Sequence, residues 1–214
     1  MIIGSSLENK EIEKRIAITP EITKKYINLG FEVQLIQNYG SHLGFHDSQF
    51  KGVGAKILCD EKELLSTSDI ILQLGLLKEN QCLMMKENQT LIGTFNSNQN
   101  KDEIQKFLSK KINIFSLELL PRITRAQSMD ILSSQANLAG YKAVIESFAF
   151  FEKAIPMMMT AAGTVPAAKV LIVGAGVAGL QAIATAKRMG AIVFATDVRM
   201  ASKEQVESLG GKFL

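Results

Sequence analysis

The sequence has 214 residues and a formal net charge of +3 at pH 7, with 47% hydrophobic and 21% charged residues. This composition is typical of a packed globular protein and excludes a disordered chain. The basic residues are spread along the sequence, which argues against nucleic acid or a lipid surface as a partner, and the most apolar stretch, residues 170–186, is too short and too interrupted for a transmembrane segment.

Short apolar runs alternate with amphipathic stretches along the first 120 residues. Thr19 and Pro20 predict the N-cap and the first residue of a helix that Gly30 closes. The same rhythm continues, with strands predicted at residues 2–3, 31–36, 70–72, 90–92 and 112–115, and helices around residues 61–65 and 102–110. Strands and helices that alternate in this way predict a parallel sheet covered by helices.

A polar stretch at residues 121–132 interrupts this alternation and predicts a loop. Helical spacing returns over residues 133–154 and ends before Pro156, with one apolar stripe formed by Leu138, Tyr141, Ile145, Phe148 and Phe151. A helix of this length spans about 30 Å, enough to connect two domains. Residues 157–166 predict a turn-rich linker, whose three methionines suit either a partner surface or buried packing.

A second α/β unit begins near Lys169. Residues 170–173 form a continuous apolar run, which is typical of a buried parallel strand. A glycine-rich turn and a helix over residues 180–189 follow, and residues 191–195 supply a second strand.

The turn between the strand and the helix has the sequence GAGVAG. Gly174 permits a tight turn, Gly176 lets the backbone approach a pyrophosphate, and Gly179 allows close helix–strand packing, so that the helix N-terminus faces the phosphates. Asp197 lies 18 residues after Gly179, at the end of the second strand, where a carboxylate accepts hydrogen bonds from an adenosine ribose and repels a 2′-phosphate. The pattern predicts NAD(H) binding; the alternative is a strand–helix turn that binds nothing.

A complete dinucleotide-binding domain has six strands. Residues 169–214 have room for about two strands and two helices, with Phe213 beginning a third strand. We therefore expect the front part of a longer subunit, in which residues 191–195 form an open apolar edge.

Three stretches of the sequence are long and unusual: residues 121–141 (PRITRAQSMDILSSQANLAGY), 156–164 (PMMMTAAGT) and 179–186 (GLQAIATA). They resemble the NAD(H)-binding component, domain I of the alpha subunit, of proton-translocating NAD(P) transhydrogenase, in the alanine dehydrogenase/transhydrogenase family. The resemblance covers the whole chain and is closest from Leu117 onward. We expect an α/β fold of two Rossmann-like parallel-sheet domains joined by a long helix, the second incomplete.

The resemblance implies a set of NAD(H)-binding positions in a loop between the domains, in the pyrophosphate turn and in the ribose segment. They are Arg122, Gln127, Asp130, Ser133, Gly174, Gly176, Val177, Ala178, Gly179, Asp197, Val198 and Arg199. Arg122 and Asp130 would orient the nicotinamide carboxamide, and Gln127 would reach toward the second nucleotide. No residue is implied as an acid or base, because hydride transfer between two nicotinamides needs positioning rather than proton transfer.

The implied activity is hydride transfer from NADH to NADP⁺ on a partner domain, coupled to proton translocation and yielding NADPH. The implied partners are NADP(H)-binding and membrane-spanning components and, for the complete subunit, a second copy in a homodimer at the cytoplasmic side of the inner membrane. No metal site is predicted. The expected boundaries are 1–132 for the N-terminal domain, 133–168 for the connecting helix and linker, and 169–214 for the first part of the NAD(H)-binding domain.

Alanine dehydrogenase, which shares the fold, is an alternative. The segment at residues 14–20 (KRIAITP) resembles both families, including Arg15, which in the dehydrogenase binds the substrate carboxylate. The dehydrogenases carry a catalytic Lys and His where this sequence has Gly75 and Asn96. Because oxidising an amino acid needs a proton acceptor, this activity is disfavoured and Arg15 is expected to be structural. A non-catalytic NAD-binding remnant is a third possibility.

Overall fold

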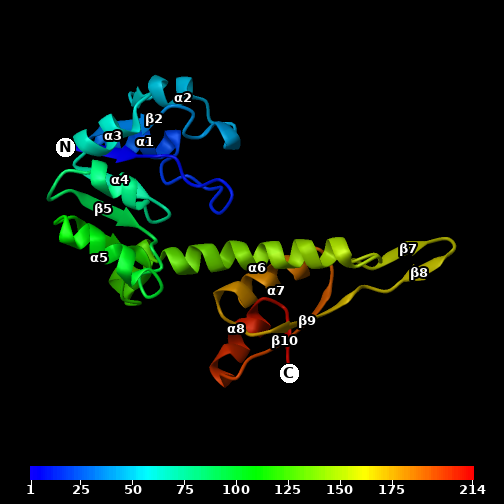
Figure 1. Cartoon of the computed structure of the whole chain (residues 1–214). Coiled ribbons are helices and arrows are strands. Elements are labelled where there is room, and N and C mark those ends of the chain that lie inside the picture. Colours follow the sequence, from blue (N-terminus) through cyan, green and yellow to red (C-terminus); the bar gives the residue numbers. More distant parts are fainter. The chain divides into compact units, whose positions relative to one another are not determined.

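Two separate parallel sheets organise the chain (Figure 1). The structure is a computed structural model that describes all 214 residues. Contacts between residues divide it into two units, Met1–Met129 and Asp130–Leu214. The predicted α/β class, with two parallel sheets and one long helix, is confirmed.

The first unit contains a six-stranded sheet in the order β3-β2-β1-β4-β5-β6, and every neighbouring pair in it is parallel. Its strands are β1 (Ile2–Ser5), β2 (Glu32–Ile36), β3 (Lys56–Leu58), β4 (Ile70–Gln73), β5 (Thr90–Gly93) and β6 (Asn113–Ser116). All five predicted strands are present; β3, a three-residue strand, was not predicted. Fully buried side chains such as Leu35, Ile71 and Leu91 place the core on the sheet.

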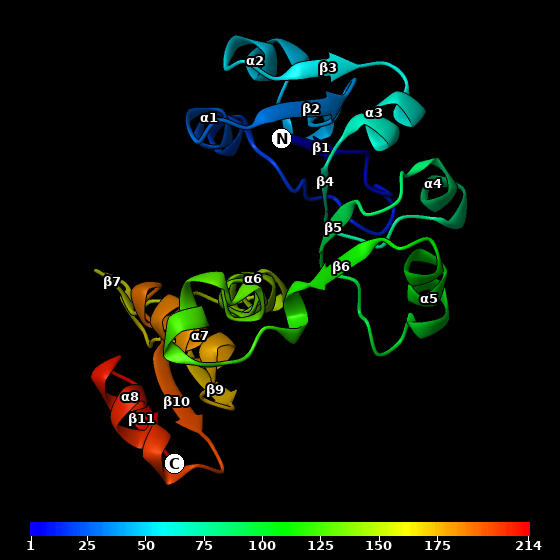
Figure 2. The same cartoon turned by 90° about the vertical axis from the view of Figure 1, so that its left-hand side faces the viewer.

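Helices cover both faces of this sheet, with α1 and α2 on one side and α3, α4 and α5 on the other (Figure 2). The α-helices are α1 (Pro20–Asn28), α2 (Asp47–Gly52), α3 (Glu61–Thr67), α4 (Glu79–Met84) and α5 (Lys101–Ser109), and the 3₁₀ helices are η1 (Ser41–Leu43), η2 (Leu117–Leu119) and η3 (Thr124–Met129). The predicted start of α1 is confirmed, because the Thr19 hydroxyl accepts a hydrogen bond from the Ile22 N–H at 3.3 Å. Gly30 follows the helix with φ +88°.

The second unit has a three-stranded parallel sheet in the order β11-β10-β9 and an antiparallel hairpin. Its elements are α6 (Ile131–Phe150), β7 (Met158–Thr160), β8 (Gly163–Val165), β9 (Lys169–Val173), α7 (Val177–Arg188), β10 (Ile192–Thr196), η4 (Met200–Ser202), α8 (Lys203–Ser208) and β11 (Lys212–Phe213). The core of this unit lies between α6, α7 and the sheet and includes Val144, Ile183 and Val193. None of the helices in the chain combines the length and the apolar character that a membrane span requires.

The prediction that residues 191–195 form the open edge of the second sheet is wrong. β10 lies in the middle of the sheet, because Lys212 and Phe213 pair with Phe194 and Ala195. The open edge is β9, in which Leu171 is 59% and Val173 79% exposed. The sequence pattern missed this pairing because a two-residue strand carries no periodic signal.

The long helix α6 differs from its prediction in length and in the face that it buries. It ends at Phe150, and Pro156 lies beyond it in the segment leading to the hairpin. Leu138 and Tyr141 of the predicted apolar stripe are exposed, whereas Gly140 and Val144 are buried. The helix packs on α7 through its smallest residue, because close approach of two backbones contributes more contact here than side-chain size.

The predicted turn-rich linker at residues 157–166 contains the β7–β8 hairpin, which extends beyond α6 in Figure 1. All six residues of its strands are exposed. Met157, Met158 and Met159 are 59%, 51% and 73% exposed, so they are not packed in the core of this chain.

Candidate functional site

The glycine turn joins β9 to α7 through Gly174, Ala175 and Gly176. Gly174 has φ +96°, a left-handed conformation that favours glycine, and its N–H donates to the Thr196 carbonyl at 2.8 Å. A Cβ on Gly179 would lie 1.8 Å from the Gly174 carbonyl oxygen. These two glycines therefore serve the backbone of the turn and the packing of the helix on the strand.

Gly176 is different from the other two glycines. Its φ of −79° suits any residue, and a Cβ built on it would meet no atom within 4 Å. It is the N-cap of α7, so no side chain caps the first N–H groups of the helix. The first turn contains no acidic residue, whereas Lys187 and Arg188 occupy the last turn. The helix therefore presents open space and the positive end of its dipole in front of the turn.

Asp197 directly follows β10 and is anchored to the glycine turn. Its Oδ2 accepts a hydrogen bond from the Ala175 N–H at 2.7 Å, and its Oδ1 accepts one from the Arg199 N–H at 2.8 Å. The Arg199 guanidinium contacts both oxygens, with Nε–Oδ1 at 3.0 Å and Nη2–Oδ2 at 3.1 Å. These hydrogen bonds, above all those from the Arg199 side chain, hold the pKa of Asp197 well below its ordinary value. Val198, between the two, is fully exposed.

Helix α6 packs directly against the first turn of α7. A Cβ on Gly140 would lie 2.0 Å from the Ala178 carbonyl oxygen, and the Asn137 side-chain amide donates to the Gln181 side chain at 3.1 Å. Gly140 was not among the predicted site residues. The only sequence signal was a glycine inside an otherwise uninterrupted 20-residue helix, which costs stability unless packing requires it.

The loop residues of the predicted nicotinamide site fall into two groups. Arg122 and Gln127 belong to the first unit and are exposed, with Gln127 in η3. Asp130 and Ser133 stand at the start of the second unit, where Asp130 is the N-cap of α6. The Asp130 carboxylate accepts hydrogen bonds from the Ser133 N–H at 2.9 Å and from the Ser133 hydroxyl at 2.6 Å. This pair therefore has a structural role of its own at the helix start.

The structure thus brings eight of the twelve predicted positions together at one corner of the second unit. These are Gly174, Gly176, Val177, Ala178, Gly179, Asp197, Val198 and Arg199. Asp130 and Ser133 form a separate pair on α6. The mutual bonding of Asp197 and Arg199 was not predicted, because an i,i+2 pair after a strand depends on the local turn.

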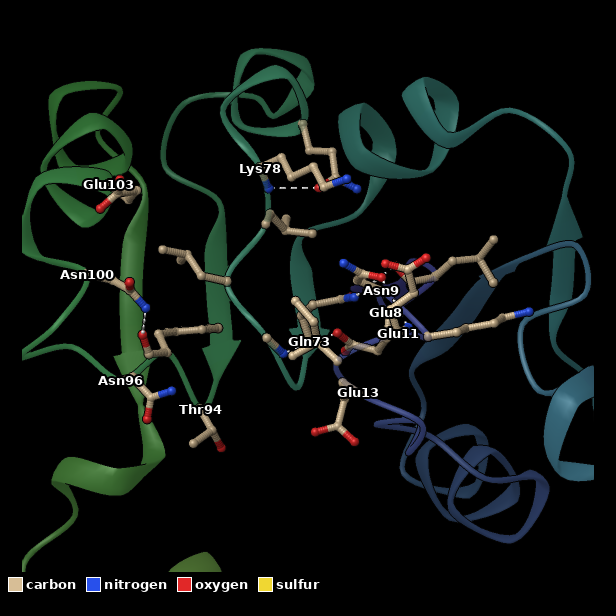
Figure 3. Close-up of a pocket in the computed structure, with 18 of the residues that line it drawn as sticks. Glu8, Asn9, Glu11, Glu13, Gln73, Lys78, Thr94, Asn96, Asn100 and Glu103 are labelled. Carbon is tan, nitrogen blue, oxygen red and sulfur yellow. Dashed lines mark hydrogen bonds between the residues drawn. The ribbon is translucent and has the colours of Figure 1, made fainter.

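A pocket of about 840 Å³ lies in the first unit, at the carboxyl ends of β1, β4 and β5 (Figure 3). In the order β3-β2-β1-β4-β5-β6, the chain reverses direction of travel between β1 and β4, which is where open α/β sheets bind ligands. Glu8 lies in this pocket, and its carboxylate accepts hydrogen bonds from the N–H groups of Leu74 at 2.6 Å and Gly75 at 3.2 Å. Burial raises the pKa of Glu8 by more than these bonds lower it.

The positions at which alanine dehydrogenase carries its Lys and His both line this pocket. They are Gly75 and Asn96, neither of which takes up or releases a proton near neutral pH. Asn96 has φ +47°, which asparagine tolerates. Arg15 forms an ion pair with Glu13 at 2.5 Å, as a structural role would require. The pocket itself was not predicted, because it depends on the strand order.

Comparison with known proteins covers the whole chain. Residues 5–139 match the family model "Alanine dehydrogenase/PNT, N-terminal domain" and residues 143–214 match "Alanine dehydrogenase/PNT, C-terminal domain". The chain is 49% identical over its full length to the first of the separate chains that make up the NAD(P) transhydrogenase alpha subunit of Rhodospirillum rubrum, and 46% identical to that of Rickettsia prowazekii. It spans 57% of the length of each. An alanine dehydrogenase of Methanococcus maripaludis is 28% identical over 92% of the chain and 53% of its own length.

Solved structures agree with these matches. A transhydrogenase from Sinorhizobium meliloti superimposes with a TM-score of 0.94 at 45% identity, over 100% of this chain and 64% of the other. An L-alanine dehydrogenase has the same fold, with a TM-score of 0.86 at 21% identity over 100% of this chain and 60% of the other. Both halves of the sequence match one family model pair, and the fold is the same; the chain therefore belongs to the alanine dehydrogenase/PNT family.

Proposed function

We propose that this chain supplies the NAD(H)-binding part of a proton-translocating NAD(P) transhydrogenase. The support is its family, its similarity to transhydrogenase alpha subunits along its whole length, and the glycine corner of the second unit. The nucleotide-binding segment is residues 169–214, after a first domain at 1–132 and a connector at 133–168. When bound, NADH supplies the hydride that reduces NADP⁺ on a separate domain.

Gly176 is the single observation that carries this proposal. The protein itself explains Gly174, which has a left-handed backbone, and Gly179, which packs against the turn. Neither strain nor crowding explains Gly176. A glycine without an internal reason, at the uncapped N-terminus of a 12-residue helix, is what the approach of a pyrophosphate to the backbone requires. Val177, Ala178 and Gly179 then offer their N–H groups to the phosphates.

The nicotinamide end is assigned to Arg122, Gln127, Asp130 and Ser133 on the strength of the sequence resemblance. Arg122 and Gln127 are exposed and available to a ligand. Asp130 and Ser133 hold each other at the start of α6, so their orientation is fixed before any ligand binds. Arg122 and Asp130 orient the carboxamide, while Gln127 reaches toward the second nucleotide. None of them acts as an acid or base, because transfer between two nicotinamides moves no proton.

Alanine dehydrogenase activity is disfavoured by the pocket of the first unit. A proton acceptor must stand beside the carbon that is oxidised, and the two positions that would supply it are Gly75 and Asn96. Glu8 occupies the backbone N–H groups of Leu74 and Gly75, so a substrate carboxylate would have to displace it.

The partners follow from the relatives, whose names describe one piece of an alpha subunit. We assign to this chain NADP(H)-binding and membrane-spanning partner components, which hold it at the cytoplasmic side of the inner membrane. The exposed β7–β8 hairpin is the surface assigned to a second copy in a homodimer, because its apolar methionines are uncovered in the single chain.

Titration of the purified protein with NADH, NADPH and AMP tests the nucleotide assignment. NADH is expected to bind at least about tenfold more tightly than NADPH, because a carboxylate meets the ribose. Equal affinities would contradict the role given to Asp197, and absence of NADH and AMP binding would contradict the site as a whole.

The nicotinamide loop is tested by hydride transfer to an NADP⁺-loaded partner. R122A and D130N should slow transfer by a larger factor than they weaken NADH binding, and AMP affinity should not change. Asparagine keeps the helix cap at position 130, and R125A, in the same exposed loop, is the matched control. A variant that loses AMP and NADH affinity equally would refute this placement.

A further inference from the structure

The carboxylate of Asp197 has no acceptor position left. A carboxylate offers about four lone-pair sites, and four N–H donors fill them here. Two are backbone groups, the N–H of Ala175 on Oδ2 and that of Arg199 on Oδ1. The other two are Nε and Nη2 of the Arg199 guanidinium. A ribose hydroxyl can therefore bind this carboxylate only if one of the four donors leaves.

The guanidinium is the donor that can leave. The backbone donors are fixed, because Ala175 is only 1% exposed and lies inside the glycine turn. The Arg199 side chain is 63% exposed, whereas that of Asp197 is 6% exposed. An arginine on the solvent side of such a pair can rotate into water, where its charge is well solvated, while the aspartate stays in place.

Resting on the NAD(H) site proposed above, we infer that Arg199 is a specificity-determining residue that competes with the adenosine ribose for Asp197. While it pairs with Asp197, it cancels the charge that would repel a 2′-phosphate. Once displaced, it offers a planar fork of donors in the same segment, which suits a phosphate. The corner therefore holds one group for each type of ribose, and their mutual pairing narrows the choice between NADH and NADPH.

The size of the effect follows from the exposure of the pair. Ion pairs that involve an exposed arginine are weak, so the displacement lowers NADH affinity by at most about fivefold. Removing the guanidinium should restore that factor for NADH. It should also leave the negative charge of Asp197 unopposed against a 2′-phosphate, which weakens NADPH binding.

The test is R199M, which keeps most of the length of the side chain and removes its charge. Dissociation constants are measured for NADH and NADPH, and for AMP and adenosine 2′,5′-bisphosphate, which isolate the adenosine half. R199M should bind NADH about two- to fivefold more tightly and NADPH more weakly, so that the ratio of the two constants widens by about tenfold. R188M, at an exposed arginine in the last turn of α7, should leave both constants unchanged.

D197N should shift the ratio in the opposite direction, because it frees Arg199 and removes the repulsion. An R199M protein with the same NADH-to-NADPH ratio as R188M, or with weaker NADH binding, would overturn the inference. If the unaltered protein binds neither NADH nor AMP, the proposed site itself fails and this inference with it. That outcome is visible before any variant is made, so the two failures are distinguishable.

Discussion

The two sheets begin in the same order but continue differently after their first strand. In the first unit, β1 is flanked by β2 and then β3; in the second, β9 is flanked by β10 and then β11, and all these pairs are parallel. Residues 6–19 separate β1 from α1, whereas only Gly174–Gly176 separate β9 from α7. The difference between the units therefore lies in one loop.

The long loop supplies its own partners to the exposed backbone groups. The Thr19 hydroxyl caps α1, and Glu8 binds the N–H groups of Leu74 and Gly75. The short turn supplies none of these, because the N-cap of α7 is Gly176. A parallel sheet and a helix do not by themselves make a phosphate site; the site requires a first loop too short and too bare to satisfy the helix N-terminus.

The largest expected effect comes from filling the bare turn. G176V should lower NADH affinity by at least about 100-fold, or about 2.8 kcal/mol, because valine occupies the open space in front of the helix. Circular dichroism should show an unchanged helix content. G52V is the matched control, since Gly52 also has open space and lies at the end of α2, in the other unit. Retained NADH binding in G176V would mean that the turn is only a packing device.

The next effect comes from moving the helix rather than filling the turn. G140A places a methyl group against the Ala178 carbonyl, and overpacking of this kind costs about 1–3 kcal/mol. Helix propensity alone would give the opposite sign, a gain of about 0.5–1 kcal/mol for alanine. Urea unfolding measures the difference. A139G, at the exposed neighbouring position, should show the ordinary propensity loss; a stabilised G140A would disprove the close approach of α6 and α7.

The sequence predicts the turn well and its surroundings poorly, for a physical reason. Val170–Val173, the glycines and Asp197 are local signals, since each depends on neighbours within one strand–turn–helix unit. The pairing of Phe213 with Ala195, the approach of Gly140 to Ala178 and the pocket around Glu8 join residues far apart in the chain. Such contacts depend on strand order and helix packing, which periodicity does not encode.

A smaller effect tests the cap that the first unit has and the second lacks. T19A removes the hydroxyl that accepts from Ile22 and should destabilise the first unit by about 1 kcal/mol. Because α7 has no side-chain cap, no alanine substitution at its N-cap can produce the same loss. Denaturant unfolding should report the change while NADH affinity stays constant. Weaker NADH binding in T19A would show that the two loops are not independent.

The smallest effect concerns Glu8, the side chain that fills the strand ends of the first unit. Burial raises its pKa above 4.5 despite the hydrogen bonds from Leu74 and Gly75. A raised pKa in the folded state means that the contribution of Glu8 to stability is fully present below pH 4.5 and is lost as pH rises through the folded pKa. At pH 7, E8Q removes the burial penalty but turns an amide N–H toward one backbone N–H, so the net change should be about 1 kcal/mol or less.

The direction of the pH dependence decides the case more sharply than that size. Relative to the unaltered protein, E8Q should be most stable at pH 7 and should lose ground as the pH falls toward 4. Glu118 is the matched opposite: burial would raise its pKa, but hydrogen bonds from Ser116 and Ser97 outweigh it and lower the pKa to about 2. Its contribution is present above pH 4.5 and is lost as the pH falls toward 2, so E118Q should gain ground on acidification. If E8Q and E118Q shift in the same direction, the hydrogen bonds to Glu8 dominate its burial, and the first loop binds its strand ends more strongly than we infer.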